Sequence, residues 1–309
     1  MNDCVAAVGT FDGVHLGHKA ILDRVKELAK ERGMNTRVIT FMNHPLSVIK
    51  PEKCPLWAVS RPYSISALER EGIDRVSEMN FTPELAALTA REFLSLMRER
   101  YGVKVLVMGY DNSFGSDRLA SREAYVEAGK DAGVEIQFVE AVKTKDGVEV
   151  SSSELRKAVE EGEMTEYCSM VSDFYNLGGT VVRGKRNGHK LGFPTVNIRP
   201  DEGIVPLPTG VYVAIAYVEK DDFGLDRDDV WGLLNVGTNP TISDGNPITY
   251  EFHAPGVDLG ELYGARFDLA VVFKFREEEK FGSLKELKQA IRQDIRFLKE
   301  FHRMFDEED

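Results

Sequence analysis

Residues 9–18 read Gly9-Thr10-Phe11-Asp12-Gly13-Val14-His15-Leu16-Gly17-His18 and join a short apolar run, residues 5–8, to a helical pattern over residues 19–31. Because free backbone N–H groups at the start of a helix attract anions, this junction favours a phosphate group. His15 and His18 stand three positions apart, so both lie on one face of the first helical turn and can donate to phosphate oxygens. Two histidines that only cap a helix would give the same pattern. A metal site is less favoured, since the sequence suggests no third ligand nearby.

The sequence around this junction alternates apolar runs with helical patterns, which predicts a doubly wound α/β domain with a parallel sheet. Residues 103–108 form a nearly continuous apolar run, typical of a strand covered on both faces. The crevice of such a sheet lies beyond the carboxyl ends of its strands, where residues 9–18 and 109–115 fall. The predicted strands are residues 5–8, 36–41, 103–108 and 135–139, and the predicted helices are residues 19–31, 86–100 and 121–132.

The pattern changes near residue 176 to short β-branched runs separated by Gly, Pro and Asn. Such regular punctuation predicts a small antiparallel β-barrel. Apolar residues at helical spacing over 283–304 predict an amphipathic C-terminal helix. We therefore expect one domain over residues 1–173 and a second over residues 174–309. The predicted barrel strands are residues 180–183, 195–198, 210–218, 230–236, 248–252 and 267–275.

Composition narrows the classes of protein. A chain of 309 residues fits about two domains. Its 51 acidic and 39 basic residues give a net charge of −12, which argues against nucleic-acid binding. Three cysteines without a C-x-x-C pair indicate neither a zinc site nor a disulfide framework, as expected in the cytoplasm, and no run of about 18 apolar residues suggests a membrane span. The oligomeric state is left open between a monomer and a weak homo-oligomer.

The pattern G-x-F-D-G-x-H-x-G-H resembles the signature of the nucleotidylyltransferase superfamily, whose members join a nucleoside monophosphate to an acceptor and release pyrophosphate. Residues 151–156, Ser-Ser-Ser-Glu-Leu-Arg, resemble a second element of the flavin branch of that superfamily. Serines at a helix start offer hydroxyl and N–H groups, and an arginine offers a planar fork for the departing phosphates, although the serines alone also fit an N-cap. The resemblance implies catalytic roles for His15, His18 and Arg156, and ATP binding by Gly9, Phe11, Asp12, Gly17, Ser151, Ser152 and Ser153.

The second half carries its own set of motifs. Residues 191–197, Leu-Gly-Phe-Pro-Thr-Val-Asn, resemble the G-F-P-T-A-N motif of riboflavin kinase. Residues 235–241 and 251–253 resemble the N-x-G-x-x-P-T and E-x-H segments of the same family. The whole chain is thus similar to the bacterial bifunctional riboflavin kinase/FMN adenylyltransferase, or FAD synthetase, family. That resemblance implies ATP-dependent conversion of riboflavin to FMN in the second domain, and of FMN to FAD in the first.

The kinase resemblance implies specific residue roles. Thr195 and Asn197 would supply oxygen ligands around Mg²⁺ and an ATP phosphate, and Glu251 would accept the proton of the riboflavin 5′-hydroxyl. Without the motifs, these residues fit a strand start and a solvated strand glutamate. Residues 179–185 match part of the Walker A spacing, but Arg186 stands where Ser or Thr should be, so we expect no P-loop. The loop after Gly184 resembles the family's basic loop over ATP, which implies contacts from Gly184, Lys185 and Lys190.

Two further segments of the first domain concern the flavin. Residues 40–45 resemble the pattern T-F-x-P-H-P, with Asn43 in place of the usual proline. Residues 109–115 resemble G-x-D-F-x-F-G, with Asn112 in the place of an aromatic residue. The resemblance implies flavin binding by Phe41, Asp111 and Phe114, and by Arg276 of the second domain.

Two other functions would account for part of these sequence motifs. The first domain could adenylylate or cytidylylate a different acceptor, such as a phosphopantetheine or a glycerol or ethanolamine phosphate, but such enzymes lack the motifs of the second half. Alternatively, the chain could be a flavin-binding regulator in which one site has lost turnover, for which Asn112 leaves an opening. Separation of the products formed from riboflavin, ATP and Mg²⁺ distinguishes these readings, since only the bifunctional enzyme yields FMN and FAD.

Overall fold

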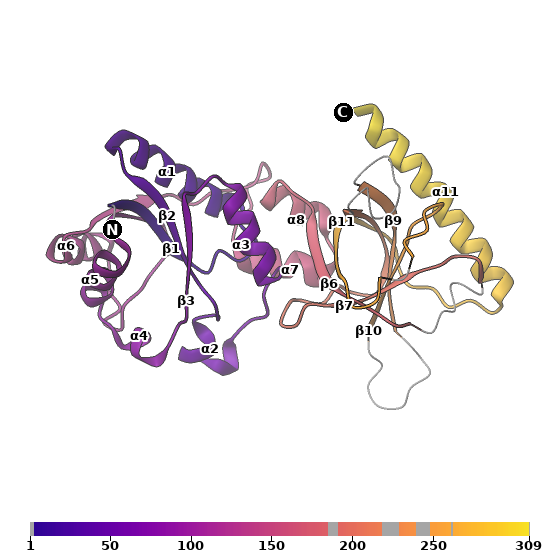
Figure 1. Ribbon diagram of the computed structural model, residues 1–309, viewed down its shortest axis with the longest axis horizontal. Coiled ribbons are helices and arrows are strands. Elements are labelled where there is room, and N and C mark those ends of the chain that lie inside the picture. The colour runs from indigo at the N-terminus through magenta and orange to yellow at the C-terminus, as the bar shows by residue number, and fades with distance from the viewer. Residues whose placement is uncertain (1–2, 185–190, 218–228, 239–247, 261, 309) are drawn as a thin grey trace. The chain divides into compact units, whose positions relative to one another are not determined.

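The computed structural model describes residues 3–184, 191–217, 229–238, 248–260 and 262–308 (Figure 1). The chain divides into two compact units. The first comprises Met1–Trp57, Arg61–Leu155 and Met170–Ser172, and the second comprises Ala58–Ser60, Arg156–Ser169 and Asp173–Asp309. Among the described residues, none of the helices combines the length and the apolar character needed to cross a membrane.

A parallel sheet with the strand order β3-β2-β1-β4-β5 forms the centre of the first unit. Strand β1 has β2 on one side and β4 on the other, so the order of the strands switches between β1 and β4. Ligands bind at such a switch, beyond the carboxyl ends of the strands. The strands are β1 (Cys4–Gly9), β2 (Asn35–Phe41), β3 (Arg75–Met79), β4 (Val103–Gly109) and β5 (Glu135–Val139).

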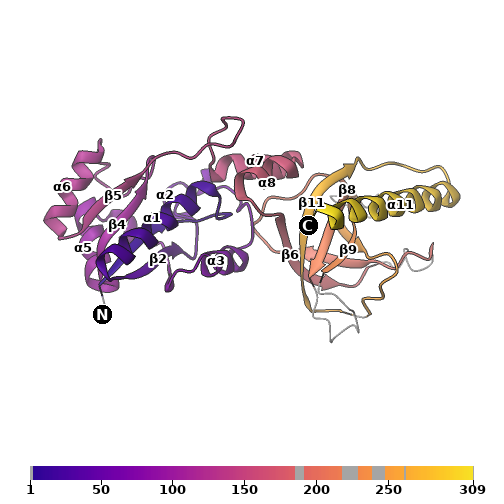
Figure 2. The same ribbon diagram turned by 90° about the horizontal axis from the view of Figure 1, so that it is seen from above.

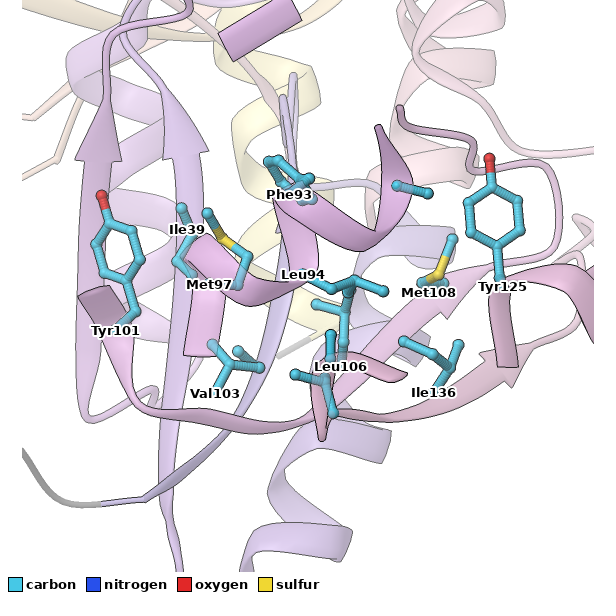
Figure 3. Packing of buried hydrophobic residues seen from close by; sticks show 14 of the residues in the cluster. Ile39, Phe93, Leu94, Met97, Tyr101, Val103, Leu106, Met108, Tyr125 and Ile136 are labelled. Atoms are coloured by element: carbon cyan, nitrogen blue, oxygen red, sulfur yellow. The ribbon is translucent and has the colours of Figure 1, made fainter. Parts of the chain in front are cut away.

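Helices cover both faces of this sheet, which confirms the predicted doubly wound α/β fold. Cys4 and Ala6 of β1 pack in one buried cluster, and Val5 and Ala7 pack in another on the opposite face. Figure 3 shows the first cluster, in which Leu94 lies close to Leu106. The helical segments of this part of the chain are α1 (Leu16–Arg32), α2 (Leu46–Ile49), η1 (Pro51–Lys53), α3 (Arg61–Arg70), α4 (Pro83–Ala87), α5 (Ala90–Tyr101) and α6 (Arg122–Ala132). Helices α7 (Ser152–Glu161) and α8 (Met164–Val171) follow β5.

An antiparallel barrel forms the second unit and closes in the order β10-β7-β6-β11-β8-β9, as the sequence predicts. Strand β6 begins at Tyr175, five residues before its predicted start, because Gly178 and Gly179 continue the strand rather than end it. A Cβ atom on Gly179 would lie 2.5 Å from the carbonyl oxygen of Arg199 on the paired strand, so glycine permits the close approach. The strands are β6 (Tyr175–Val182), β7 (Val196–Pro200), β8 (Gly210–Tyr217), β9 (Asp229–Thr238), β10 (Ile248–His253) and β11 (Arg266–Arg276).

The C-terminal helix α11 (Leu284–Glu308) packs against the outside of this barrel, alongside β8 and β9 (Figure 2). Its Leu298 is buried against Val213 and Ile215 of β8, and the aromatic rings of Phe297 and Phe301 cover the same apolar surface. This packing confirms the predicted amphipathic helix, whose polar face remains in solvent.

Candidate active sites

The backbone of the turn after β1 has several positive φ angles. Phe11 and Val14 have φ angles of 49° and 41°, and Gly13 between them has a φ of 78°. A positive φ is costly for a β-branched residue such as valine, and such conformations gather at functional sites. Phe11 and Val14 are almost completely buried, so packing holds the turn in this shape. The turn brings the chain directly into α1, whose first turn contains no acidic residue.

His15 and His18 meet at the start of α1, as the sequence predicts. His15 is the N-cap, and its Nδ1 atom accepts a hydrogen bond from the backbone N–H of His18 at 3.3 Å. A neutral His15 therefore carries its proton on Nε2, which can donate to an anion. The two rings are stacked, with centroids 3.7 Å apart. Burial first, and then the proximity of His15, hold the pKa of His18 well below its usual value.

The serine segment at the start of α7 contacts the same turn. The hydroxyl of Ser152 donates to the backbone oxygen of Asp12 at 3.2 Å, across 140 residues of sequence. Ser151 caps α7, because its hydroxyl accepts from the backbone N–H of Glu154 at 3.3 Å. Ser153 is exposed, and Arg156 lies four residues after Ser152 in α7. The structure thus brings a serine of the second motif to the turn after β1 and gives Ser151 the capping role left open by the sequence, while Arg156 belongs to the second unit.

Arg61 supports this turn and was not predicted from the sequence. Its guanidinium donates to the backbone oxygen of Thr10 at 3.0 Å and to the hydroxyl of Thr40 at 3.1 Å. Thr40 itself donates to the same Thr10 oxygen at 3.1 Å. Burial lowers the pKa of the Arg61 guanidinium, and the nearby carboxylates of Glu78 and Asp12 oppose that shift. Thr40 and Arg61 lie 30 and 51 residues after Thr10 in the sequence, so no local sequence pattern indicates these hydrogen bonds.

An apolar cleft of about 520 Å³ opens at the carboxyl edge of the same sheet. Phe41 and Phe114, both predicted to bind flavin, line it, and so do Gly9 and Asn112. The side chain of Asp111, the third predicted flavin residue of this unit, is exposed and is not part of the lining. Further lining residues are Thr10, Pro45, Phe81, Leu85, Leu88, Phe93, Met108 and Tyr125.

Phe114 is held in this wall by a tyrosine. The hydroxyl of Tyr125 accepts from the backbone N–H of Phe114 at 3.1 Å and donates to its backbone oxygen at 3.0 Å. The rings of Phe114 and Phe93 lie 4.9 Å apart between centroids. One edge of the cleft is therefore an ordered aromatic surface, suited to a flat apolar ring.

A second cavity, of about 150 Å³, lies in the barrel unit. Gly184, Thr195 and Asn197, three of the predicted ATP-binding residues, line it. A Cβ atom on Gly184 would lie 2.5 Å from the Oδ1 atom of Asn197, so a side chain at residue 184 would displace this amide from its observed position. The cavity also has an apolar wall from Val181, Val196, Phe252, Leu259 and Leu262.

Glu251 occupies the middle of a polar row across three strands. It pairs with Asn197 of β7 on one side and with Asn235 of β9 on the other. Directly paired residues project from the same face of a sheet, so the carboxylate and both amides share one face. The hydroxyl of Thr195 lies 3.5 Å from the Glu251 carboxylate and donates to it. The structure therefore brings together Thr195, Asn197 and Glu251, as the sequence predicts.

His253 fixes the segment that precedes β7. Its Nδ1 atom lies 2.7 Å from the backbone oxygen of Pro194. Since a carbonyl oxygen only accepts, Nδ1 carries the proton in this contact. Burial lowers the pKa of His253, and the bond to Pro194 partly offsets that shift. A neutral His253 thus anchors Pro194 beside the Thr195 side chain.

Arg276, predicted to bind flavin, is already engaged in the structure. Its guanidinium donates to both carboxylate oxygens of the buried Asp294 in α11, at 3.1 and 2.8 Å. The bonds to Asp294 raise the pKa of Arg276. Lys185, Arg186 and Lys190, and the segment 239–241, lie outside the described residues.

The two units together define a class of enzyme. The first has a helix start with two histidines at the switch point of a doubly wound sheet, which suits nucleotide phosphates, and the second has a hydroxyl, amide and carboxylate cluster in a barrel. This arrangement is that of a nucleotide-dependent transferase with two sites in one chain.

Comparison with known proteins identifies the family. The FAD synthetase family model matches residues 1–154, and the riboflavin kinase model matches residues 171–302. The bifunctional riboflavin kinase/FMN adenylyltransferase of Pseudomonas fluorescens is 33% identical over 295 residues, covering 94% of this chain and 91% of that protein. Its counterpart in Escherichia coli K12 is 31% identical over 299 residues, covering 96% and 92%. A solved structure described as a macrolide-efflux protein from Streptococcus pneumoniae aligns with a TM-score of 0.84 at 25% identity, covering 96% of this chain and 94% of that one.

The chain belongs to the family of bifunctional riboflavin kinase/FMN adenylyltransferases. The adenylyltransferase activity belongs to the first half and the kinase activity to the second, in the order predicted from the motifs. Family membership supports this function over the two alternatives, a different acceptor or a flavin-binding regulator.

Proposed function

We propose that His15, His18 and the start of α1 hold the α-phosphate of ATP while the phosphate of FMN attacks it. A bond forms between an FMN phosphate oxygen and the α-phosphorus, and the bond to the departing pyrophosphate breaks. Preorganised donors stabilise the charge that develops on the α-phosphate oxygens. The stacked histidines at the helix start carry this proposal, because the hydrogen bond to Nδ1 places the proton of a neutral His15 on Nε2, an atom that donates to phosphate oxygens. Gly9, Phe11, Asp12, Gly17 and Ser151–Ser153 would shape the ATP site, and Arg156 would contact the pyrophosphate.

The apolar cleft beside this turn is the proposed site of the isoalloxazine ring of FMN. Gly9 and Thr10 belong both to the cleft lining and to the turn that leads to His15. A ring between Phe41 and Phe114 would therefore leave the FMN phosphate on the side of the histidines. Asp111 precedes the lining residue Asn112, and its exposed carboxylate would bond a polar group of the nucleotide or flavin.

In the barrel we propose that Glu251 accepts the proton of the riboflavin 5′-hydroxyl. The hydroxyl oxygen then bonds to the γ-phosphorus of ATP, and ADP departs. Thr195 and Asn197 line the adjoining cavity, where their hydroxyl and amide groups would meet the nucleotide phosphates. Gly184, with Lys185 and Lys190 after it, would cover ATP, and Arg276 would approach the flavin beside its partner Asp294.

The residues of the barrel site fit Mg²⁺. This ion prefers oxygen ligands, keeps several waters, and is commonly held by one or two protein oxygens together with substrate phosphates. Thr195 and Asn197 supply such oxygens, and no group of three or more His, Cys, Asp or Glu that could hold a metal occurs among the described residues. When bound, Mg²⁺ would neutralise charge on the ATP phosphates.

The proposed functional domains are residues 1–173 for FMN adenylyl transfer and 174–309 for riboflavin phosphorylation. The absence of paired-cysteine motifs and the use of ATP favour the cytoplasm as the site of action. Small molecules are the proposed partners, and the enzyme would act as a monomer or a weak homo-oligomer.

Two variants test these assignments. Glu251→Gln should lose FMN formation from riboflavin but keep FAD formation from supplied FMN. His15→Ala combined with His18→Ala should do the opposite. Chromatographic separation of riboflavin, FMN and FAD reads both reactions in one sample, and loss of both activities in either variant would refute the division of roles.

A further inference from the structure

The side chain of Asn43 makes an unusual pair of contacts just beyond the edge of the sheet. Its Nδ2 atom donates to the backbone oxygen of Phe81 at 3.0 Å, and its Oδ1 atom accepts from the backbone N–H of Phe81 at 2.8 Å. A carboxamide presents the same donor and acceptor as a peptide unit. The Asn43 side chain therefore bonds both backbone groups of Phe81, a residue 38 positions further along the sequence.

This contact continues the ladder of the sheet. Phe41, the last residue of β2, pairs with Met79 of β3, and the N–H of Met42 donates to the oxygen of Met79 at 3.0 Å. The Asn43 side chain then bonds the residue two positions further on, Phe81. A side chain thus replaces the backbone where the regular pairing of β2 and β3 ends.

Phe81 is in turn part of the cleft wall. Its ring packs edge-on against that of Phe41, with centroids 5.3 Å apart and planes at 89°. Both rings line the cleft of about 520 Å³. The two hydrogen bonds of Asn43 consequently tie Phe81 into this aromatic corner, as the two hydrogen bonds of the Tyr125 hydroxyl tie Phe114 into the cleft lining.

We propose that Asn43 is a positioning residue for flavin binding in FMN adenylyl transfer, acting through the Phe81 ring. The family pattern that residues 40–45 resemble has proline at this position, and proline has no side-chain donor or acceptor with which to make these two bonds. The inference rests on the proposed placement of the flavin ring in the cleft. It predicts a change in FMN affinity with little change in ATP binding.

The test compares Asn43→Ala and Asn43→Asp with the wild type. Asn43→Ala removes both bonds, whereas Asn43→Asp keeps the acceptor but places a carboxylate oxygen against the Phe81 carbonyl. Both should raise the KM for FMN about tenfold and leave the KM for ATP unchanged. Ser47→Ala is the matched control, because it removes only the 3.3 Å contact between Asn43 and the Ser47 hydroxyl. Riboflavin phosphorylation, measured in the same samples, should be normal in all three variants.

A double-mutant cycle with Phe81→Ala decides whether Asn43 acts through that ring. If it does, Asn43→Ala should add nothing to the KM of the Phe81→Ala variant. An additive effect, an equal rise in the KM for ATP, or an unchanged KM for FMN in the Asn43 variants would overturn the inference. If Phe81→Ala and Phe41→Ala themselves leave the KM for FMN unchanged, the proposed flavin placement fails and the inference fails with it.

Discussion

The imidazole rings of His15 and His18 stack with centroids 3.7 Å apart and planes inclined by 20°. Two charged imidazolium rings at this separation would repel each other, and burial further disfavours a charge on His18. The pKa of His18 is accordingly held well below its usual value of 6.5. His18 is therefore neutral near pH 7, and the negative charge of a bound phosphate would favour its protonated form.

This depressed pKa predicts how stability depends on pH. The unfolded chain binds a proton at His18 near pH 6.5 and the folded chain does not, so the contribution is intact above pH 6.5 and is lost as the pH falls below it. The free energy of unfolding should fall by at most about 1.4 kcal/mol per pH unit from this group. Urea unfolding at several values between pH 7.5 and 5.5 measures the slope. The His18→Gln variant should show a shallower slope, and an identical slope would contradict the assigned cause.

Removal of the Ser152 hydroxyl should impair adenylyl transfer alone. The bond from Ser152 to the Asp12 oxygen joins the start of α7 to the phosphate-binding turn. A hydrogen bond of this kind contributes about 1 kcal/mol, which is close to a fivefold effect. Ser152→Ala should lower kcat/KM for FAD formation by about that factor. Ser169→Ala, which removes a hydroxyl that donates to the backbone oxygen of Glu166 in α8, provides the comparison, and an equal loss there would show that the Asp12 contact is not the cause.

A methyl group at residue 184 should block the kinase site. The Cβ atom of alanine would lie 2.5 Å from the Oδ1 atom of Asn197, well inside normal contact. Gly184→Ala should therefore reduce riboflavin phosphorylation by at least about tenfold, which corresponds to about 1.4 kcal/mol. FAD formation from supplied FMN should be unaffected. Full kinase activity in this variant would mean that the Asn197 amide is not needed in its observed position.

Replacement of Arg61 should destabilise the nucleotide-binding turn. Its guanidinium satisfies the Thr10 oxygen and the Thr40 hydroxyl, and it lies 4.8 Å from the centroid of the Trp57 ring. Arg61→Met keeps the length of the side chain but loses these contacts, at a cost of about 2 kcal/mol in the free energy of unfolding. We expect a higher KM for ATP in adenylyl transfer. A variant with unchanged stability and unchanged KM would remove Arg61 from the support of the turn.

The order of the elements and the main motifs could be predicted from the sequence because those signals are local. The apolar run of β4 and the β-branched runs of the barrel indicate their strands directly. Strand β3 could not be predicted, since Arg75 and Glu78 are exposed on an edge strand and leave no apolar run. In the sequence, Gly178 and Gly179 suggest an interruption between strands, although in the barrel they lie within β6 and permit close strand pairing.

Predicted site residues that belong to one short motif lie together in the structure, as His15 and His18 do, and Thr195 and Asn197. The residues that hold these groups in place could not be predicted. Arg61, Tyr125 and His253 act through backbone oxygens of distant residues, and a backbone oxygen has no signature in the sequence. Asn43 stood out only as a departure from the family pattern, and its contact with Phe81 required the fold.

Complementation between two inactive variants tests the central claim most directly. With riboflavin, ATP and Mg²⁺ as the only substrates, Glu251→Gln should make no FAD because it makes no FMN. The His15→Ala/His18→Ala variant should stop at FMN. A mixture of the two proteins should form FAD, since FMN released by one barrel reaches the intact adenylyltransferase site of the other chain. A mixture that forms no FAD, or either variant forming FAD from riboflavin alone, would contradict two separate sites acting in sequence.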